Sequence, residues 1–500
     1  MSEPIKSHNI EQFRAAIAAG MGLLFDDARV GFLGEVLQRR VDRSGLPAQV
    51  YLSALAARAD KSEQAALARE LTVGETYFFR NHEQFAALAE IAVPDRMRAN
   101  AASRTLRLLS AGCASGEEPY TLAIVAREWV ADPAWTIKIR ATDINPAALE
   151  RAERGRYSTW ALRETPASVQ ARWFHPAGRE LLLDDSVRQA VRFDERNLAV
   201  DDAELWQPGS LDIVFCRNVI MYFAPDQARA LIERIVEALQ PGGYLFLGHA
   251  ETLRGLSDDF HLKHTHGTFY YQRKAELGQA DPPRAAFVGS PARVHEATAL
   301  DENWIDLIRQ ASERVAALTA TPCRARPHTP AAPAVDLVRV LELMRSEQFA
   351  EALALLRALP AASGRDPETL LLEAMLLAHS GSLPAAEDTC KRLLAIDELN
   401  AGAHYVFALC RESAADRTGA AEHDRVAVYL DPAFAMPRLH LGLMARRAGD
   451  RGAARSELAQ AVVLLKREDA SRLLLFGGGF NREALLTLAE SALRDCGGAP

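Results

Sequence analysis

The chain's most constraining feature is an alternation of short apolar runs and amphipathic stretches between residues 104 and 274. The runs TLRLLSAG, TIKIRATD, LDIVFCRN, GYLFLGHAE and GTFYYQRK have the length and apolar content of buried strands. Strands that alternate with helices are typical of a parallel sheet with helical crossover connections. We therefore predict an α/β fold with a doubly wound sheet for this segment.

Different patterns flank and interrupt the predicted sheet. Residues 1–92 carry apolar side chains at i, i+3 and i+4 spacing, which predicts an N-terminal helical subdomain. The sheet domain is expected over residues 93–274, with a small antiparallel β insert at about 175–196. Prolines and polar residues predict a linker over residues 275–334, within which DENWIDLIRQASERVAAL is a candidate amphipathic helix.

The chain after residue 335 is rich in alanine and leucine and repeats itself. Four alanines recur every 34 residues, at Ala352, Ala386, Ala420 and Ala454. Asp397 and Asp431 precede the next helical stretch at the same offset. This spacing resembles that of tetratricopeptide repeats, in which small residues let paired helices approach closely. An alanine-rich bundle without repeats is the alternative, and the in-phase turns favour an α-helical solenoid over residues 335–500.

Composition and charge limit the partners of the chain. The 500 residues carry a net charge of −8, which disfavours nucleic acid or anionic lipid as the main partner. We find no run of about 18 apolar residues and expect no membrane insertion. The six cysteines are scattered without a C-x-x-C pair, so neither a metal site nor a disulfide framework is indicated, and a cytoplasmic location fits best.

A glycine loop follows the first predicted strand, in the segment SAGCASGEEPYTLAI. Gly112 and Gly116 have a G-x-x-x-G spacing, which differs from the G-x-G-x-x-G of dinucleotide sites. Glu117 and Glu118 follow at once and would repel a pyrophosphate. They suit S-adenosylmethionine, whose methionine end carries an ammonium and a sulfonium. The alternative is that both glutamates only complement the dipole at a helix N-terminus.

Further polar residues follow the later strands. Asp143 ends the second strand, where an acid accepts hydrogen bonds from a ribose diol, although it could instead cap the next helix. Asn197 follows another strand-like run, at a position where an adenine edge could be read. Arg217, Asn218 and Tyr222 follow the run LDIVFC. Because ligands bind at the carboxyl edge of such sheets, we interpret these residues as candidates for a binding site.

Six motifs in this order resemble those of the CheR-type chemotaxis-receptor glutamate methyltransferases. They are GETYFFRN, SAGCASGEEPYTLAI, ATDINPAALERAERGRYS, NL, FCRNVIMYF and PGGYLFLGHAETL, and the resemblance covers about residues 10–273. It implies a class I methyltransferase fold and a protein-glutamate O-methyltransferase that uses S-adenosylmethionine and releases S-adenosylhomocysteine. The implied partner is the cytoplasmic domain of a methyl-accepting receptor, whose glutamates become γ-methyl esters.

The resemblance also implies roles for individual residues. Arg80 and Tyr222 are expected nearest the transferred methyl, as the catalytic residues. The expected cofactor-binding residues are Thr76, Arg80, Gly112, Glu118, Asp143, Asn197, Leu198, Asn218 and Val219. Gly74 stands where some family members have asparagine, which removes one side-chain hydrogen bond to the cofactor. Apart from the resemblance, Arg80 could be a helix-capping surface residue and Tyr222 a buried ring.

The resemblance suggests two surfaces that could meet the receptor. Arg39, Arg40 and Arg43 belong to one predicted helix and could contact an acidic receptor helix, although a solvated face is the alternative. The β insert corresponds to a subdomain that docks a receptor's C-terminal peptide in some members. Because the insert here looks shorter, we predict no peptide tether. Nothing in the sequence identifies the partner of the repeats.

Two other functions stay open at this point. One is a methyltransferase with a different acceptor, although NVIMYF differs from the Asn/Asp-Pro-Pro-Tyr/Phe motif of enzymes that methylate nucleic-acid amino groups. The other is a non-catalytic scaffold that senses S-adenosylmethionine and binds partners through its repeats. The presence of Arg80, Glu118, Asp143 and Tyr222 argues against the scaffold. The chemistry of the glycine loop disfavours a nicotinamide-dependent oxidoreductase.

Overall fold

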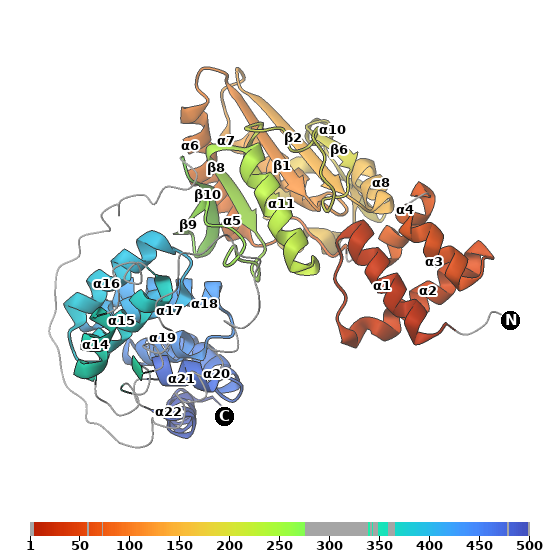
Figure 1. Ribbon diagram of the computed structural model, residues 1–500. Coiled ribbons are helices and arrows are strands. Elements are labelled where there is room, and N and C mark those ends of the chain that lie inside the picture. Colours follow the sequence, from red (N-terminus) through yellow and green to blue (C-terminus); the bar gives the residue numbers. More distant parts are fainter. Residues whose placement is uncertain are drawn as a thin grey trace. The chain divides into compact units, whose positions relative to one another are not determined.

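The structure is a computed structural model that describes most of the chain (Figure 1). The described residues are 5–57, 60–72, 74–275, 339–340, 343, 349–358, 366–477 and 480–498. The chain divides into two compact units, Met1–Gly278 and Gln279–Pro500. The predicted linker and its candidate helix lie outside the described residues, apart from residue 275.

Four helices open the first unit, as the apolar spacing predicts. They are α1 (Ser7–Met21), α2 (Val30–Ser44), α3 (Ala48–Ala56) and α4 (Lys61–Leu71). Their apolar faces meet in one core around Phe13, Leu37 and Leu67, each fully buried. α1 ends at Gly22 and α2 at Gly45, with φ of 75° and 67°, a left-handed conformation that glycine adopts without strain.

A seven-stranded sheet forms the centre of the first unit, in the order β6-β2-β1-β7-β8-β10-β9. The strands are β1 (Thr105–Ala111), β2 (Thr136–Asp143), β6 (Val191–Glu195), β7 (Leu211–Cys216), β8 (Leu239–Leu247), β9 (Phe260–Thr265) and β10 (Thr268–Arg273). The strands β6 to β8 in this order pair in parallel, and β10 pairs antiparallel with both β8 and β9. The chain winds outward in both directions from β1 and β7, which confirms the predicted doubly wound sheet and places a ligand crevice at their carboxyl ends.

Helices cover the sheet, and a second small sheet lies beside it. The helices are α5 (His82–Ala87), α6 (Val93–Ala99), α7 (Glu117–Trp129), α8 (Pro146–Arg154), α9 (Ala167–Trp173), α10 (Asp185–Arg188) and α11 (Pro225–Ala238), with a π-helical turn at Leu88–Ala92. α7 packs against β1, β2 and β6, and α11 packs against β8. Phe85 of α5 stacks on Phe215, which stacks on Phe246, with ring centroids 5.5 and 4.4 Å apart. This aromatic stack joins α5 to the centre of the sheet.

The small sheet differs in extent from the predicted insert. It contains β3 (Arg156–Tyr157), β5 (Glu180–Leu183) and β4 (Phe174–Ala177), in that order and antiparallel. Residues 191–195, which the prediction includes in the insert at about 175–196, instead pair in parallel with β2 as strand β6 of the main sheet. The physical reason is the apolar alternation of Val191 and Phe193, which pack into the main core.

The second unit is built from helices that pack in antiparallel pairs. They are α14 (Phe349–Arg357), α15 (Pro367–His379), α16 (Leu383–Ile396), α17 (Ala401–Ser413), α18 (Arg417–Leu430), α19 (Ala435–Arg447), α20 (Arg451–Leu465), α21 (Ala470–Phe476) and α22 (Arg482–Asp495). The alanines that recur every 34 residues lie in α14, α16, α18 and α20, and all four are fully buried. A Cβ added at Gly442 of α19 would lie 2.6 Å from Leu458 of α20, so the paired helices are in close contact. The repeat pattern is therefore a packing pattern, as the sequence predicts.

Within the described ranges, no helix is both long enough and apolar enough to cross a membrane.

Candidate functional site

A pocket opens at the carboxyl ends of β1, β2, β6 and β7. Its empty volume is about 870 Å³, including the solvent at its open mouth. Seven residues that the sequence predicts for the site line it: Gly112, Asp143, Asn197, Leu198, Asn218, Val219 and Tyr222. The structure thus brings together residues that are up to 110 positions apart in the chain, from four separate strand ends.

Glycines let the loop after β1 approach its neighbours closely. Gly112 has φ of 77°, and a Cβ there would lie 2.4 Å from the side chain of Val219. Gly116 has φ of 92°, and a Cβ there would lie 2.7 Å from the Cβ of Ala152. A larger residue at Gly112 would push apart the loops after β1 and β7, and one at Gly116 would push the loop away from α8.

Asp143 lies at the end of β2 and faces the glycine loop. Its carboxylate accepts the N–H of Ala114 at 2.8 Å and the N–H of Asn145 at 2.8 Å. Burial raises the pKa of Asp143, and these backbone bonds act in the opposite direction. Asn145, rather than Asp143, caps α8, because its Oδ1 accepts the N–H groups of Ala147 and Ala148. The helix-cap alternative for Asp143 is therefore wrong, and each carboxylate oxygen keeps acceptor capacity for a ligand hydroxyl.

Asn197 ties the loop after β6 to the end of α1. Its amide donates to the carbonyl of Gly20 at 2.8 Å, and its Oδ1 accepts the N–H of Ala199 at 2.9 Å. Both the nitrogen and the oxygen of the side-chain amide are therefore hydrogen-bonded to backbone groups of the protein. Asn197 still lines the pocket, and its contact with an adenosine stays a prediction.

A segment that the sequence analysis missed forms one wall of the pocket. We call residues 20–25, which comprise the end of α1 and the turn that follows it, the strap. The N–H of Leu24 donates to the carbonyl of Tyr222 at 2.7 Å, and Leu23 forms a β-bridge with Phe223. Because these bonds join residues about 200 positions apart, only the dense glycines of AAGMGLLF hint at the strap in the sequence.

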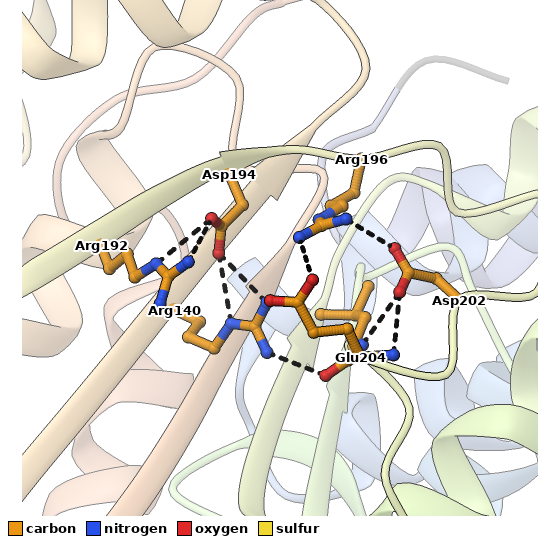
Figure 2. A network of polar contacts seen from close by, with 7 residues as sticks. Arg140, Arg192, Asp194, Arg196, Asp202 and Glu204 are labelled. Carbon is orange, nitrogen blue, oxygen red and sulfur yellow. Dashed lines mark hydrogen bonds and ion pairs between the residues drawn. The ribbon is translucent and has the colours of Figure 1, made fainter.

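A network of ion pairs fixes the loop after β6 (Figure 2). Arg140 on β2 donates to Asp194 on β6 at 3.1 Å and to the carbonyl of Glu204 at 3.2 Å. Arg196 donates to Asp202 at 3.1 Å and to the Glu204 carboxylate at 2.8 Å. These bonds hold the loop that carries Arg196 into the pocket wall, so Arg196 is engaged with carboxylates of its own chain.

Glu118 lies outside the pocket lining and is paired with a buried arginine. It accepts the hydroxyl of Ser110 at 2.8 Å and the guanidinium of Arg217 at 3.2 Å. Burial raises the pKa of Glu118, and Arg217 opposes that shift. The neighbouring Glu117 is also buried and accepts the hydroxyl of Ser115 at 2.8 Å, and burial raises its pKa to about 7. The two glutamates that look alike in sequence therefore have different partners, a buried guanidinium for Glu118 and a hydroxyl for Glu117.

Arg217 also holds the loop that carries Arg80. Its guanidinium donates to the carbonyl of Arg80 at 2.7 Å and to the side chain of Asn81 at 2.6 Å. Phe79 and Asn81 have φ of 58° and 60°, which are uncommon values for residues with side chains. These bonds from Arg217 bring Arg80 near Glu118. The lining of the pocket does not include Arg80, Thr76 or Glu118.

Sequence relatives decide the family to which this geometry belongs. A model of the CheR methyltransferase SAM-binding domain matches residues 74–269. The chain is 34% identical over 275 residues to chemotaxis protein methyltransferase 2 of Vibrio cholerae, across 54% of this chain and 94% of that protein. This chain belongs to the CheR methyltransferase family. The predicted family, the enzyme class and the cofactor S-adenosylmethionine are thereby confirmed.

Two further relatives of this CheR family chain show how far the similarity extends. Chemotaxis protein methyltransferase 1 of Pseudomonas aeruginosa is 32% identical over 266 residues, across 52% of this chain and 89% of that protein. The probable biofilm formation methyltransferase WspC of Pseudomonas putida is 28% identical over 457 residues, across 89% of this chain and 96% of that protein. The second match includes the helical repeats as well as the methyltransferase domain.

The pocket of this CheR methyltransferase fits the cofactor. Its charged lining residues in the described part of the chain are Arg29, Asp143 and Arg196, and the last already pairs with two carboxylates. Asp143 offers acceptors to a ribose, and the lining contains no lysine among the residues that the structure describes. Gly74 lines the same pocket, and a Cβ there would meet nothing closer than 3.9 Å, so this position has room for a side chain.

The arginines predicted to meet a receptor are mostly engaged within this CheR methyltransferase. Arg40 is buried and donates to Glu63 at 2.8 Å through its Nε. Arg39 donates to Glu70 at 3.0 Å, whereas Arg43 is exposed. The basic character of α2 is therefore smaller than the sequence indicates, and its contact with a receptor stays a prediction.

Proposed function

We propose that this methyltransferase converts glutamate side chains on the cytoplasmic domain of a methyl-accepting receptor into γ-methyl esters. The observation that carries the proposal is the match to almost the full length of relatives that are named chemotaxis protein methyltransferases. The structure supports it with a pocket at the strand ends that contains Asp143 and with a loop, carrying Arg80, that Arg217 holds in place.

We assign the pocket residues to parts of the cofactor as follows. Asp143 accepts the ribose hydroxyls, and Leu198 and Val219 give apolar walls to the adenosine together with the backbone of Asn197 and Asn218. Glu118 and Thr76 contact the methionine portion of S-adenosylmethionine. Gly112 keeps the loop after β1 close to the loop after β7, which shapes the floor of the site. S-adenosylmethionine, when bound, supplies a methyl group made electrophilic by its positive sulfonium.

The acceptor requires orientation more than it requires a base. A glutamate side chain has a pKa of about 4.3, so at neutral pH it is already a carboxylate and a nucleophile. Arg80 holds this carboxylate through its N–H donors, and Tyr222 in the pocket wall contributes a hydrogen bond or its ring face. Arg80 must not bind the carboxylate too tightly, because ground-state stabilisation would slow the attack.

The helical repeats give the enzyme a second surface for proteins. Stacked helix pairs present a concave face that suits a helix or an extended peptide. We assign protein–protein interaction to residues 335–500, in a cytoplasmic enzyme whose other predicted domains are residues 1–92 and 93–274. The relative WspC, which aligns across the repeats, supports a shared architecture.

A labelled-methyl experiment tests the proposed function. The full chain is incubated with methyl-labelled S-adenosylmethionine and a panel of receptor cytoplasmic domains, and the labelled product is then treated with base. Volatile labelled methanol is expected, because a carboxyl ester releases it and an N-methyl product does not. Label that enters protein without base-labile methanol indicates a different acceptor. If the chain binds S-adenosylhomocysteine but transfers label to no receptor, the scaffold alternative is supported instead.

A further inference from the structure

A carboxylate beyond β8 holds the loop that follows β7. Glu251 is 3% exposed, and its Oε2 accepts the N–H groups of Asn218 at 2.6 Å and Gly248 at 2.7 Å. Its Oε1 accepts the N–H groups of Val219 at 2.8 Å and Met221 at 3.2 Å. One side chain therefore satisfies four backbone donors from two separate segments.

The loop after β7 needs such an acceptor because its backbone is irregular. Asn218 has φ of 56°, and the short 3-10 helix Ile220–Tyr222 follows Val219 directly. The N–H groups at the start of this loop donate to Glu251 instead of to an acceptor in a neighbouring strand or in a preceding helical turn. Buried N–H groups without an acceptor are costly, so the conformation of residues 218–222 depends on the Glu251 carboxylate.

The contact between Glu251 and the loop is tight on both sides. A Cβ added at Gly248 would lie 2.6 Å from Oε2 of Glu251 and 2.9 Å from the N of Asn218. Glycine at 248 thus lets the end of β8, the carboxylate and the loop meet without a side chain between them. This arrangement fixes the distance between the ends of β7 and β8.

The residues that Glu251 holds are residues of the pocket. Asn218, Val219 and Tyr222 all line it, whereas Glu251 itself does not. We propose that Glu251 is a positioning residue, which fixes residues 218–222 in the conformation that receives the cofactor and presents Tyr222. Only the part about Tyr222 rests on the proposed function; the part about cofactor binding does not.

A glutamine at this position separates positioning from simple packing. Glu251→Gln preserves the size of the side chain but replaces one acceptor oxygen by an NH2 group, which faces two N–H donors. Glu251→Asp preserves the charge but is one methylene shorter and does not reach all four donors. Glu251→Asp is therefore expected to hold residues 218–222 less firmly than the wild type does, and Glu251→Gln is expected to lose most of this hold.

Asp212 gives a matched control at the other end of β7. It is fully buried and accepts the N–H of Arg107 at 2.9 Å and the side-chain amide of Asn100 at 2.7 Å. Asp212→Asn thus also removes a buried carboxylate that accepts a backbone N–H. Asp212 is not a lining residue of the pocket. Both substitutions are expected to lower the melting temperature of the full chain.

Calorimetric titration with S-adenosylhomocysteine is the deciding measurement. Glu251→Gln is expected to raise the Kd about tenfold or more, Glu251→Asp less, and Asp212→Asn less than twofold. Amide hydrogen exchange without ligand gives a second readout, in which the amides of residues 218–221 exchange faster only in the Glu251 variants.

Three results separate the possible failures. A Kd in Glu251→Gln within twofold of wild type, or equal loss in Glu251→Gln and Asp212→Asn, would overturn the positioning role. A Glu251→Gln chain that does not fold leaves the comparison to Glu251→Asp, for which the same criteria hold. Wild-type protein that binds S-adenosylhomocysteine but methylates no receptor contradicts the proposed function and leaves the role of Glu251 standing.

Discussion

At the scale of single residues, the site depends on pairs that are distant in sequence. Glu118 and Arg217 are 99 positions apart, yet they form a buried ion pair at 3.2 Å that also holds the carbonyl of Arg80. The charge on Glu118 is therefore partly neutralised before any ligand binds. Glu118 is thus not a free charge that attracts a cationic cofactor, as its position in the sequence suggests, although the predicted cofactor is correct.

Arg80→Ala tests the separation between catalysis and cofactor binding. Because the proposed function assigns Arg80 to the acceptor carboxylate, the Kd for S-adenosylhomocysteine should stay within about threefold of wild type. The kcat for methyl transfer should fall about 100-fold, because the acceptor carboxylate loses its orienting donors. Arg163→Ala is the matched control, since Arg163 lies 3.6 Å from the centre of the Tyr77 ring that Arg80 also faces. Near-normal turnover in Arg80→Ala would refute the assignment.

Gly74→Asn tests the one departure from the family pattern. The site of the missing side chain is open, so the substitution should not disturb the fold. If asparagine adds one hydrogen bond to the cofactor, the Kd for S-adenosylhomocysteine should fall roughly threefold to tenfold. Gly31→Asn, on an exposed position with nothing within 4 Å, should leave the Kd unchanged. Weaker binding in Gly74→Asn would show that glycine itself is required there.

At the scale of elements, the sequence predicts the regular parts well and the tertiary loops poorly. Apolar runs of strand length locate β1, β2, β7 and β8, because strands that pack into the core leave a local apolar pattern. The strap leaves no such pattern, since its bonds reach Tyr222 and Asn197. Glu251 is missed for the same reason: it lies 33 positions after Asn218, and only the fold shows that they meet.

Two helix-capping glycines test the role of the strap. Gly22 and Gly45 both end helices with positive φ, so alanine at either position should cost about 1 kcal/mol of stability. A Cβ at Gly22 would also lie 2.7 Å from the Cβ of Ala199, whereas a Cβ at Gly45 meets nothing within 4 Å. Gly22→Ala should therefore displace the strap and raise the Kd for S-adenosylhomocysteine about fivefold or more, and Gly45→Ala should not. Equal Kd values in the two variants would show that the strap does not contribute to cofactor binding.

At the scale of the whole molecule, each unit has its own buried charges. The repeat unit contains a cluster in which His440 contacts Asp424 at 2.7 Å and Glu412 at 2.8 Å. Burial alone would lower the pKa of His440, but the two carboxylates outweigh it and raise the pKa to about 9. Burial raises the pKa of Asp424 to about 6, against the effect of His440. At neutral pH the histidine is thus a cation between two acids.

The stability of the repeat unit should consequently fall in alkali. A histidine whose pKa is higher in the folded than in the unfolded chain stabilises fully below its unfolded pKa of about 6.5, and this contribution is lost as the pH rises through about 9. Calorimetry of the full chain between pH 7 and 10 should show the repeat transition moving down by roughly 5 °C. That transition is the one that S-adenosylhomocysteine does not raise. His440→Gln should lose most of this pH dependence, and an unchanged dependence would contradict the linkage.

The central claim is that the pocket at the strand ends binds a methyl donor without phosphates, and titration calorimetry of the full chain tests it directly. S-adenosylhomocysteine should bind with a stoichiometry of about one, and Asp143→Ala should weaken that binding about tenfold or more, because the ribose acceptor is lost. NAD⁺ should give no binding heat at the same concentrations. Binding of NAD⁺ with no binding of S-adenosylhomocysteine would contradict the account.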